Sequence, residues 1–260
     1  ISLFFLIIFS SMTVPAGTAD SLGVDDSESV RIDSIKISGN ELTEQYIITR
    51  ELTFKEGDYV TGKVLRFNRE RIYSLDLFNR VEFQIKVAEQ LNILEIQLTE
   101  SWYLYPIPFV YAENGDYEKA TFGINLLYKN FRGRNEILRA RIGFGYDPYY
   151  SIFYENPALF HESGIGITVG LGYGKFYNRN KQIKKIIGGD FQYKSISQIV
   201  SVSKRINQFN LIYLTLGYTY TETPFYREGI NASNERIDRT VLGGIGYYYD
   251  SRDLKQYSRE

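Results

Sequence analysis

Few residue types in this 260-residue chain could carry covalent or metal chemistry. It has no Cys and a single His, His161, which excludes thiolate nucleophiles, disulfides and multi-histidine metal sites. The 31 Asp and Glu residues show no pair that we can place in a pocket for general acid–base catalysis. His161 lies in the turn-like stretch "LFHESG", where a solvated loop histidine is expected. We therefore predict no enzyme activity, no metal site and no cofactor.

A glycine-rich stretch, "GIGITVGLG", could be mistaken for a phosphate-binding loop. Such a loop must turn out of a strand and open a helix. Here the glycines from Gly164 to Gly172 keep a strict period of two, which is typical of one face of a strand. The net charge of -1 argues against a nucleic-acid partner. With these kinds of site excluded, the chemistry left to the chain is hydrogen bonding by strand backbones. The positions and order of the strands are therefore the next question.

Residues 30–100 predict a compact α+β unit. A strand with a bulge comes first, and Thr43 and Thr61 can each cap a helix after it. Two strands with alternating apolar residues follow, over 79–87 and 94–98. The order β-α-α-β-β lets two helices cover one face of a three-stranded sheet.

After Glu100 the helical spacing disappears, and about eight alternating segments, each near the length of a membrane strand, recur up to Asp250. In "NEILRARIGFGYDP", Leu138 and its alternate neighbours are apolar, whereas Arg139 and Arg141 share the other face. A water-soluble β-domain also alternates. The polar opposing face and the aromatic residues near the strand ends favour a transmembrane β-barrel.

The first 19 residues predict a signal peptide that lacks its basic start. Leu3–Phe9 is an apolar run, followed by Ser, Pro and small residues up to Ala19. The alternative is a membrane-spanning helix, but the run is far shorter than the roughly 20 residues that a span needs. Residues 20–29 are small and acidic and predict a linker. Export together with the absence of Cys indicates a bacterial envelope protein.

The unit over residues 30–100 resembles a POTRA domain of the Omp85 superfamily. The matching positions are Gly39, Asn40, Thr43, Arg50, Glu51, Gly57, Asp58, Arg69, Arg71, Leu75, Leu77, Phe78, Val81 and Glu100. The stretches "NFRGRNEIL" at Asn130 and "YENPALF" at Tyr154 resemble early barrel segments of BamA- and TamA-like proteins. "YYYDSRD" at Tyr247 resembles a mid-barrel turn of that family.

This resemblance implies an α+β POTRA domain followed by part of an antiparallel transmembrane β-barrel, with about eight of roughly sixteen strands present. The expected domains are a signal peptide (1–19), a linker (20–29), the POTRA domain (30–100) and the N-terminal part of the barrel (101–260). One POTRA unit is visible, and the Val-Arg-Gly-Phe-type motif of a later loop is missing. We therefore expect the chain to be the N-terminal part of a longer protein.

The function that the resemblance implies is assembly or insertion of outer-membrane proteins, with the POTRA domain in the periplasm. The expected partners are outer-membrane lipid, unfolded outer-membrane or exported polypeptides, and accessory assembly subunits. Two alternatives stay open. One is a dedicated polypeptide exporter of the two-partner-secretion type, and the other is a passive porin or surface-antigen barrel.

An edge strand of the POTRA sheet is the predicted docking site for an extended client, because its N–H and C=O groups are unpaired. The candidate residues are Asn79, Arg80, Val81, Glu82, Phe83, Gln84, Ile85, Lys86 and Val87. The alternative is that this strand only completes the domain core, since edge strands are usually protected.

Pro106 and Pro108 are candidate seam residues, because each removes a ladder donor from the first barrel strand. We hypothesise that they weaken the seam so that it opens laterally; alternatively, they lie in the linker before the barrel. A third candidate group, Asp250, Arg252 and Asp253, either anchors a turn through a salt bridge or meets a loop in the lumen.

Overall fold

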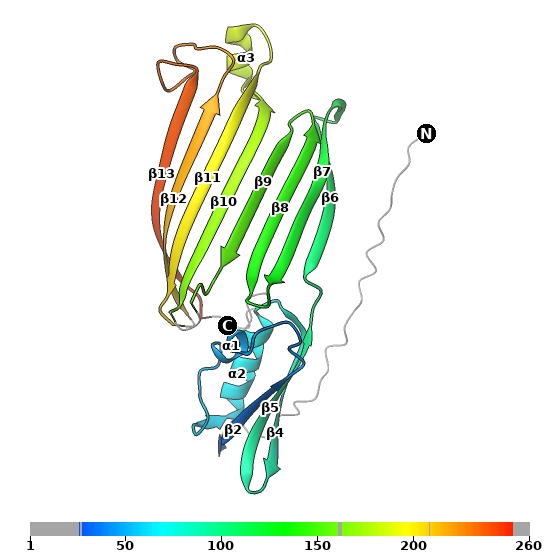
Figure 1. Cartoon of the computed structure of the whole chain (residues 1–260), viewed down its shortest axis with the longest axis vertical. Coiled ribbons are helices and arrows are strands. Elements are labelled where there is room, and N and C mark those ends of the chain that lie inside the picture. Colours follow the sequence, from blue (N-terminus) through cyan, green and yellow to red (C-terminus); the bar gives the residue numbers. More distant parts are fainter. Residues whose placement is uncertain (1–25, 27, 161–162, 208, 252–260) are drawn as a thin grey trace, which may run out of the picture.

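The computed structural model describes residues 26, 28–160, 163–207 and 209–251. The predicted signal peptide, His161, Arg252 and Asp253 lie outside these residues. The described chain forms a small N-terminal domain and a long eight-stranded sheet, which are stacked end to end (Figure 1).

The N-terminal domain confirms the predicted α+β order. Its elements are β1 (Ser29–Arg31), β2 (Ser34–Ser38), α1 (Gln45–Thr49), β3 (Tyr59–Thr61), α2 (Gly62–Tyr73), β4 (Phe78–Ala88) and β5 (Leu91–Glu100). The three-stranded sheet has the order β2-β5-β4, with β2 parallel and β4 antiparallel to β5. The strands β1 and β3 pair separately. Both helices lie on one side of the sheet (Figure 1).

The core of this domain lies between α2 and the sheet. Leu65, Asn68 and Ile72 of α2 are fully buried, and their spacing puts them on one helix face. Leu65 and Ile72 pack with fully buried Leu94 and Ile96 of β5 in one cluster. Each buried Leu or Ile side chain contributes about 1.5–3 kcal/mol to folding. This burial gives the domain a rigid platform for its edge strand.

Two local predictions for this domain are wrong. The predicted bulged strand over 30–38 is broken at Ile32, which is fully buried and donates its N–H to the Asp58 carbonyl at 3.0 Å. Before Ile32 the chain pairs with β3, and after it the chain pairs with β5. The uneven apolar spacing therefore marks the point at which the chain passes from one sheet to another. The N-cap position of the first helix is Glu44, whose side chain makes no capping hydrogen bond, and the Thr43 hydroxyl donates to the Glu100 carboxylate instead. The cap at Thr61 is confirmed.

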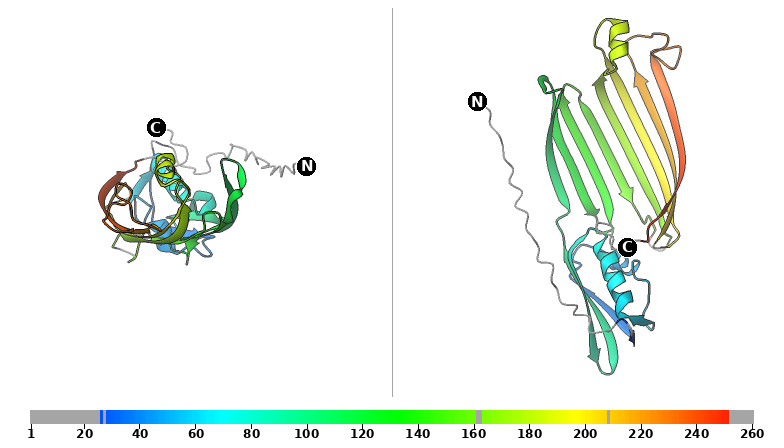
Figure 2. Two further views of the ribbon diagram at one scale, coloured as in Figure 1. Left: turned by 90° about the horizontal axis from the view of Figure 1, so that it is seen from above. Right: turned by 180° about the vertical axis from the view of Figure 1, so that it is seen from behind.

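The second part of the chain is an antiparallel sheet in which each strand pairs with the next along the sequence. Its strands are β6 (Leu104–Glu113), β7 (Asp116–Phe131), β8 (Glu136–Gly145), β9 (Tyr149–Asn156), β10 (Ile165–Tyr177), β11 (Gln192–Arg205), β12 (Asn210–Glu222) and β13 (Ile237–Tyr249). A short helix, α3 (Lys181–Ile187), connects β10 to β11 at the end far from the N-terminal domain (Figure 1). The sheet is curved like an open trough (Figure 2). Within the described residues, β6 and β13 are its two edges and do not pair with each other.

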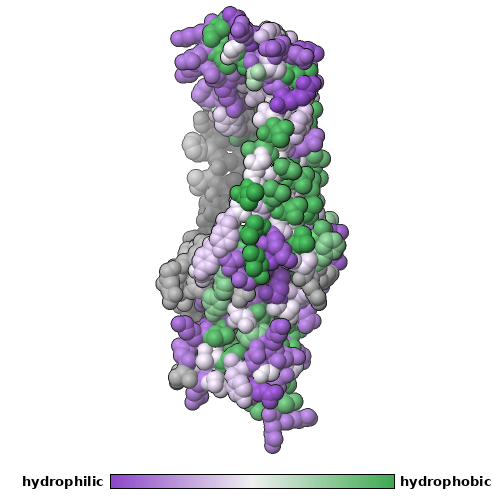
Figure 3. All heavy atoms as spheres, turned by 90° about the vertical axis from the view of Figure 1, so that its left-hand side faces the viewer, coloured by the Kyte–Doolittle hydropathy of each residue, from purple (hydrophilic) through white to green (hydrophobic). Residues whose placement is uncertain are grey.

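The two faces of the sheet differ in the way that the alternation predicts. One face carries an apolar row in which Val169, Val200 and Leu216 are cross-strand neighbours. The other face carries small and polar residues, for example the row Gly172, Ser197, Thr219 and Thr240. Figure 3 shows a hydrophobic band on the β13 side of the molecule, between hydrophilic ends. No helix among the described residues is long and apolar enough to cross a membrane.

Candidate functional site

The predicted docking strand, β4, lies at an edge of the three-stranded sheet. The turn at Glu89 and Gln90 has positive φ at both residues and closes on the pair Ala88 and Leu91. A two-residue turn of this type closes on a hydrogen-bonded pair. Along an antiparallel ladder, hydrogen-bonded and non-hydrogen-bonded pairs then alternate, starting from the pair next to the turn. The backbone groups of every second residue of β4 therefore point to the open edge: Val81, Phe83, Ile85 and Val87.

The other edge strand of this sheet, β2, is partly blocked by the domain itself. The Glu56 carboxylate accepts hydrogen bonds from the Ile35 N–H at 2.8 Å and from the Ser34 hydroxyl at 3.3 Å. A carboxylate on an edge donor is a common protection against strand addition. Within the described part of the chain, no side chain occupies the outward groups of β4 in this way, so β4 is the more available edge.

Pro106 and Pro108 lie inside β6, opposite Leu126 and Ile124 of β7, and not in the linker before the sheet. The Lys129 N–H donates to the Tyr103 carbonyl at 2.8 Å, which identifies the hydrogen-bonded pairs of this ladder as those of the odd-numbered β6 residues. The ring nitrogens of both prolines therefore face the open side of β6. This edge presents carbonyl acceptors at both positions but no N–H donor.

Asp250 follows β13 and lies at the end of the sheet that meets the N-terminal domain. Its carboxylate accepts from the Tyr248 hydroxyl at 2.7 Å, and its N–H donates to the Phe209 carbonyl at 2.9 Å. Its two predicted partners, Arg252 and Asp253, lie outside the described residues.

Sequence reasoning missed the junction between the two parts of the chain, where Glu51 is buried among arginines. Arg205, from the end of β11, binds both carboxylate oxygens of Glu51 at 2.6 and 2.8 Å. Arg71 of α2 donates to the same carboxylate at 2.8 Å, and Arg50 Nε lies 3.5 Å from it. Burial raises the pKa of Glu51, but the hydrogen bonds and charge of Arg205, with Arg50 and Arg71, lower that pKa to about 2.

Aromatic contacts support this ion pair. The Phe67 ring of α2 lies 6.2 Å from the Phe209 ring, which comes from the turn between β11 and β12. The Arg71 guanidinium lies over both rings, at 5.8 and 5.1 Å from their centroids. The β11–β12 turn is therefore held to α2 by charge and by ring packing together.

A second contact joins the N-terminal domain to the turn between β7 and β8. Arg134 Nε donates to the Glu44 carboxylate at 2.7 Å, and the Glu44 N–H donates to the Gly133 carbonyl at 2.8 Å. A Cβ on Gly133 would lie 1.9 Å from the Leu42 carbonyl oxygen, and φ at Gly133 is +73°. Asn130 adds a bond to the Thr43 hydroxyl at 2.8 Å. The close approach of the two backbones requires glycine at this turn.

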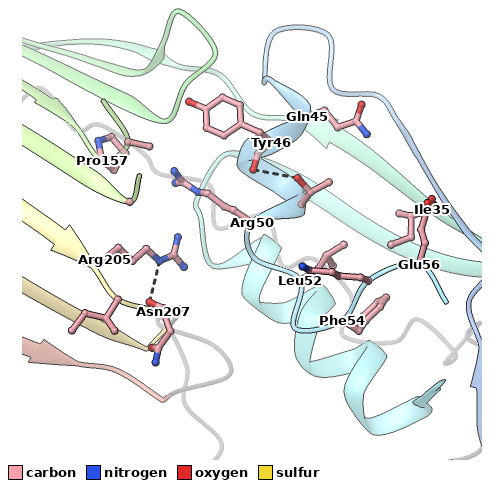
Figure 4. A pocket seen from close by; sticks show the side chains of 15 residues that line it. Ile35, Gln45, Tyr46, Arg50, Leu52, Phe54, Glu56, Pro157, Arg205 and Asn207 are labelled. Carbon is pink, nitrogen blue, oxygen red and sulfur yellow. Dashed lines mark hydrogen bonds between the residues drawn. The ribbon is translucent and has the colours of Figure 1, made fainter. Parts of the chain in front are cut away.

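A cavity of about 930 Å³ lies at this junction, beside Arg205 (Figure 4). Tyr46, Arg50 and Phe54 line it from the N-terminal domain, and Pro157, just after β9, and Arg205, at the end of β11, line it from the sheet. The junction is thus a clamp around an open space. Its residues can bind and orient a polypeptide or hold the two parts together. The described residues contain no group of three or more His, Cys, Asp or Glu side chains suited to a metal ion.

Residues 30–101 match the POTRA family model, described as "Surface antigen variable number repeat". The described fold is similar to BamA from Haemophilus ducreyi lacking POTRA domains 1–3, with a TM-score of 0.57, 15% identity, and coverage of 88% of this chain and 46% of that one. CdiB from Acinetobacter baumannii matches with a TM-score of 0.48 and 16% identity, covering 88% of this chain and 44% of that one. CdiB from Escherichia coli has a TM-score of 0.48 and 12% identity, covering 85% and 42%. This chain therefore spans less than half the length of each of these proteins.

Comparison with curated protein sequences finds no match. The family match covers the N-terminal domain, and the BamA likeness extends over the eight-stranded sheet. Residues 30–101 therefore match a POTRA domain, and the described residues share the fold of BamA across the eight-stranded sheet.

Proposed function

We propose that this chain acts in the assembly or insertion of outer-membrane proteins. The observation that carries the proposal is the pair of open strand edges, β4 of the POTRA domain and β6 of the sheet, joined by a docked interface. In this proposal residues 1–19 are a signal peptide, 20–29 a linker and 30–100 the periplasmic POTRA domain. Residues 101–260 belong to a barrel in the outer membrane.

The first step is capture of an unfolded client as an added strand on β4. The outward N–H and C=O groups of Val81, Phe83, Ile85 and Val87 supply the hydrogen bonds. Glu82, Gln84 and Lys86 on the solvent face are polar, so recognition depends mainly on backbone and tolerates many client sequences. The clients are unfolded outer-membrane or exported polypeptides, and accessory assembly subunits would bind elsewhere.

The second step is transfer of the client to the edge of β6. A partner strand on this edge finds no donor at Pro106 or Pro108, so its pairing is weaker there than along an ordinary strand. Weak pairing lets a closed barrel open at β6 and lets a client strand take the vacated edge. Export of a polypeptide through the barrel is the alternative outcome of the same capture step.

Substitution of Val87 tests the capture step. Val87 is exposed, and its N–H points to the open edge, so Val87→Pro removes a docking donor without emptying the core. Val87→Ala keeps that donor and is the matched control. We expect Val87→Pro to slow client insertion into lipid vesicles severalfold and Val87→Ala to leave it unchanged. The full-length protein is used, with circular dichroism as the check on folding.

Equal insertion rates for the two variants would contradict docking at β4. A substrate that is released across the vesicle membrane rather than inserted would identify an exporter. Leakage of small solutes with no effect on either kind of polypeptide would identify a passive pore.

A further inference from the structure

A row of cations crosses the apolar face of the sheet near its α3 end. Lys175 of β10 is directly opposite Lys194 of β11, which is directly opposite Glu222 of β12. Lys175 lies two and four residues beyond Tyr173 and Leu171, so it is on the same face as the hydrophobic band. Arg239 of β13 is opposite Tyr220 on that face.

These cations lie just beyond a belt of aromatic rings. Tyr150 and Tyr173 stack with centroids 6.3 Å apart, and Phe144 contacts Tyr150 edge-on at 6.0 Å. Rings of this kind mark the interface between the apolar interior of a membrane and its head groups. Residues one step further toward α3 therefore lie at the level of the lipid head groups.

The charges in this row do not balance. Glu222 accepts from Lys194 at 2.9 Å and lies 3.2 Å from Arg236 Nη2, so one carboxylate serves two cations. Lys175 and Arg239 are exposed cations that add to the same face. Directly opposite like charges, as in the pair of Lys175 and Lys194, are destabilising unless an anion lies between them.

The opposite end of the same face offers a comparison. Lys204 of β11 lies on the same face as Lys194, ten residues along the strand, and donates to the Ser163 carbonyl. It is paired directly with Ile212 rather than with another cation. Lys204 therefore has a hydrogen-bond partner within the chain at this end. At the α3 end, Lys194 and Arg236 share one carboxylate, and Lys175 and Arg239 add two further cations to the same face.

We propose that Lys175, Lys194, Arg236 and Arg239 form a binding site for the phosphate groups of anionic lipid in the membrane leaflet on the α3 side. Arginine forks bind phosphate oxygens bidentately, and lysine supplies point charge beside them. The apolar band below the site would contact the acyl chains of the same lipid (Figure 3). The inference rests on the proposed membrane placement of the sheet, but not on client capture by β4.

The test compares lipids that differ only in phosphate. The full-length protein in nanodiscs of phosphatidylcholine is titrated with lipid A, with dephosphorylated lipid A and with phosphatidylglycerol, and binding is followed by native mass spectrometry. The wild type is expected to prefer lipid A to its dephosphorylated form. Each removed surface charge is worth about fivefold in affinity, so Lys175→Gln with Arg239→Gln should lower lipid A binding by about 25-fold. Lys204→Gln is the matched control and should bind like the wild type.

Binding of lipid A above phosphatidylglycerol would identify the phosphates of the glycolipid as the ligand, and equal binding would identify phosphates of any anionic lipid. Equal binding of lipid A and its dephosphorylated form would overturn the proposal, as would an equal loss in the Lys204→Gln control. Client insertion measured on the same variants separates the two proposals. A loss of lipid binding with normal insertion leaves the assembly function intact.

Discussion

Glu51 shows how a single carboxylate can hold two domains. Its side chain is buried, and Arg205 from the sheet and Arg71 from α2 share its oxygens. A buried carboxylate without such partners would protonate, because burial raises its pKa. The arginines lower the pKa of Glu51 instead, so the ion pair is present at neutral pH.

The pKa of about 2 at Glu51 predicts how docking depends on pH. Because this value is below the ordinary 4.5, the stabilisation is complete above pH 4.5 and is lost as pH falls toward 2. Arg205, the partner from the sheet, is the largest cause of the lowering, so protonation of Glu51 weakens docking. We expect energy transfer between dyes on Val87→Cys and Glu118→Cys to fall over this range, and Glu51→Gln to show the lower value already at pH 7. The chain has no other Cys, so labelling is specific. A Glu51→Gln profile that matches the wild type would disprove the role of this carboxylate.

At the level of elements, the β6 edge makes a second prediction. Pro106→Val with Pro108→Val restores two N–H groups on the open side, each worth about 0.5–1.5 kcal/mol when paired. A partner strand should then hold β6 more firmly. We expect client insertion by the full-length protein to slow about tenfold and its thermal stability to rise. Ile107→Val, whose N–H points toward β7, is the control and should change neither. Unchanged insertion in the double variant would rule out the weak-seam mechanism.

The elements themselves could largely be predicted from the sequence. Apolar and polar residues that alternate over ten or more positions are compatible with few structures other than a β-strand. The strands of the sheet, α2 and the cap at Thr61 follow from local pattern. The break at Ile32 could not be predicted, since it depends on Asp58 and Asn92, which are distant in sequence. The junction was missed for the same reason. Glu51 and Arg71 were noted as positions of resemblance, but their partner Arg205 lies 154 residues from Glu51.

At the level of the whole molecule, docking depends on the tight β7–β8 turn as well as on the Glu51 ion pair. Gly133→Ala places a methyl group against the Leu42 carbonyl and strains a positive φ. We expect this variant to separate the POTRA domain from the sheet, seen as reduced energy transfer with the dye pair above, while the POTRA core stays folded. Gly189→Ala has open space around it and is the control. Unchanged energy transfer in Gly133→Ala would show that the β7–β8 turn does not set the docking.

The separation of Glu51 and Arg205 along the chain also sets an order of events during synthesis. The buried cluster of the POTRA core lies within residues 32–103, so it can form before the later strands are made. The clamp at Glu51 must wait for β11, because the loop that it closes spans 154 residues. Until then the Glu51 pocket lacks its bidentate arginine. A newly made chain therefore passes through a stage in which a finished POTRA domain is tethered but undocked, and a chaperone could distinguish this stage from the mature protein.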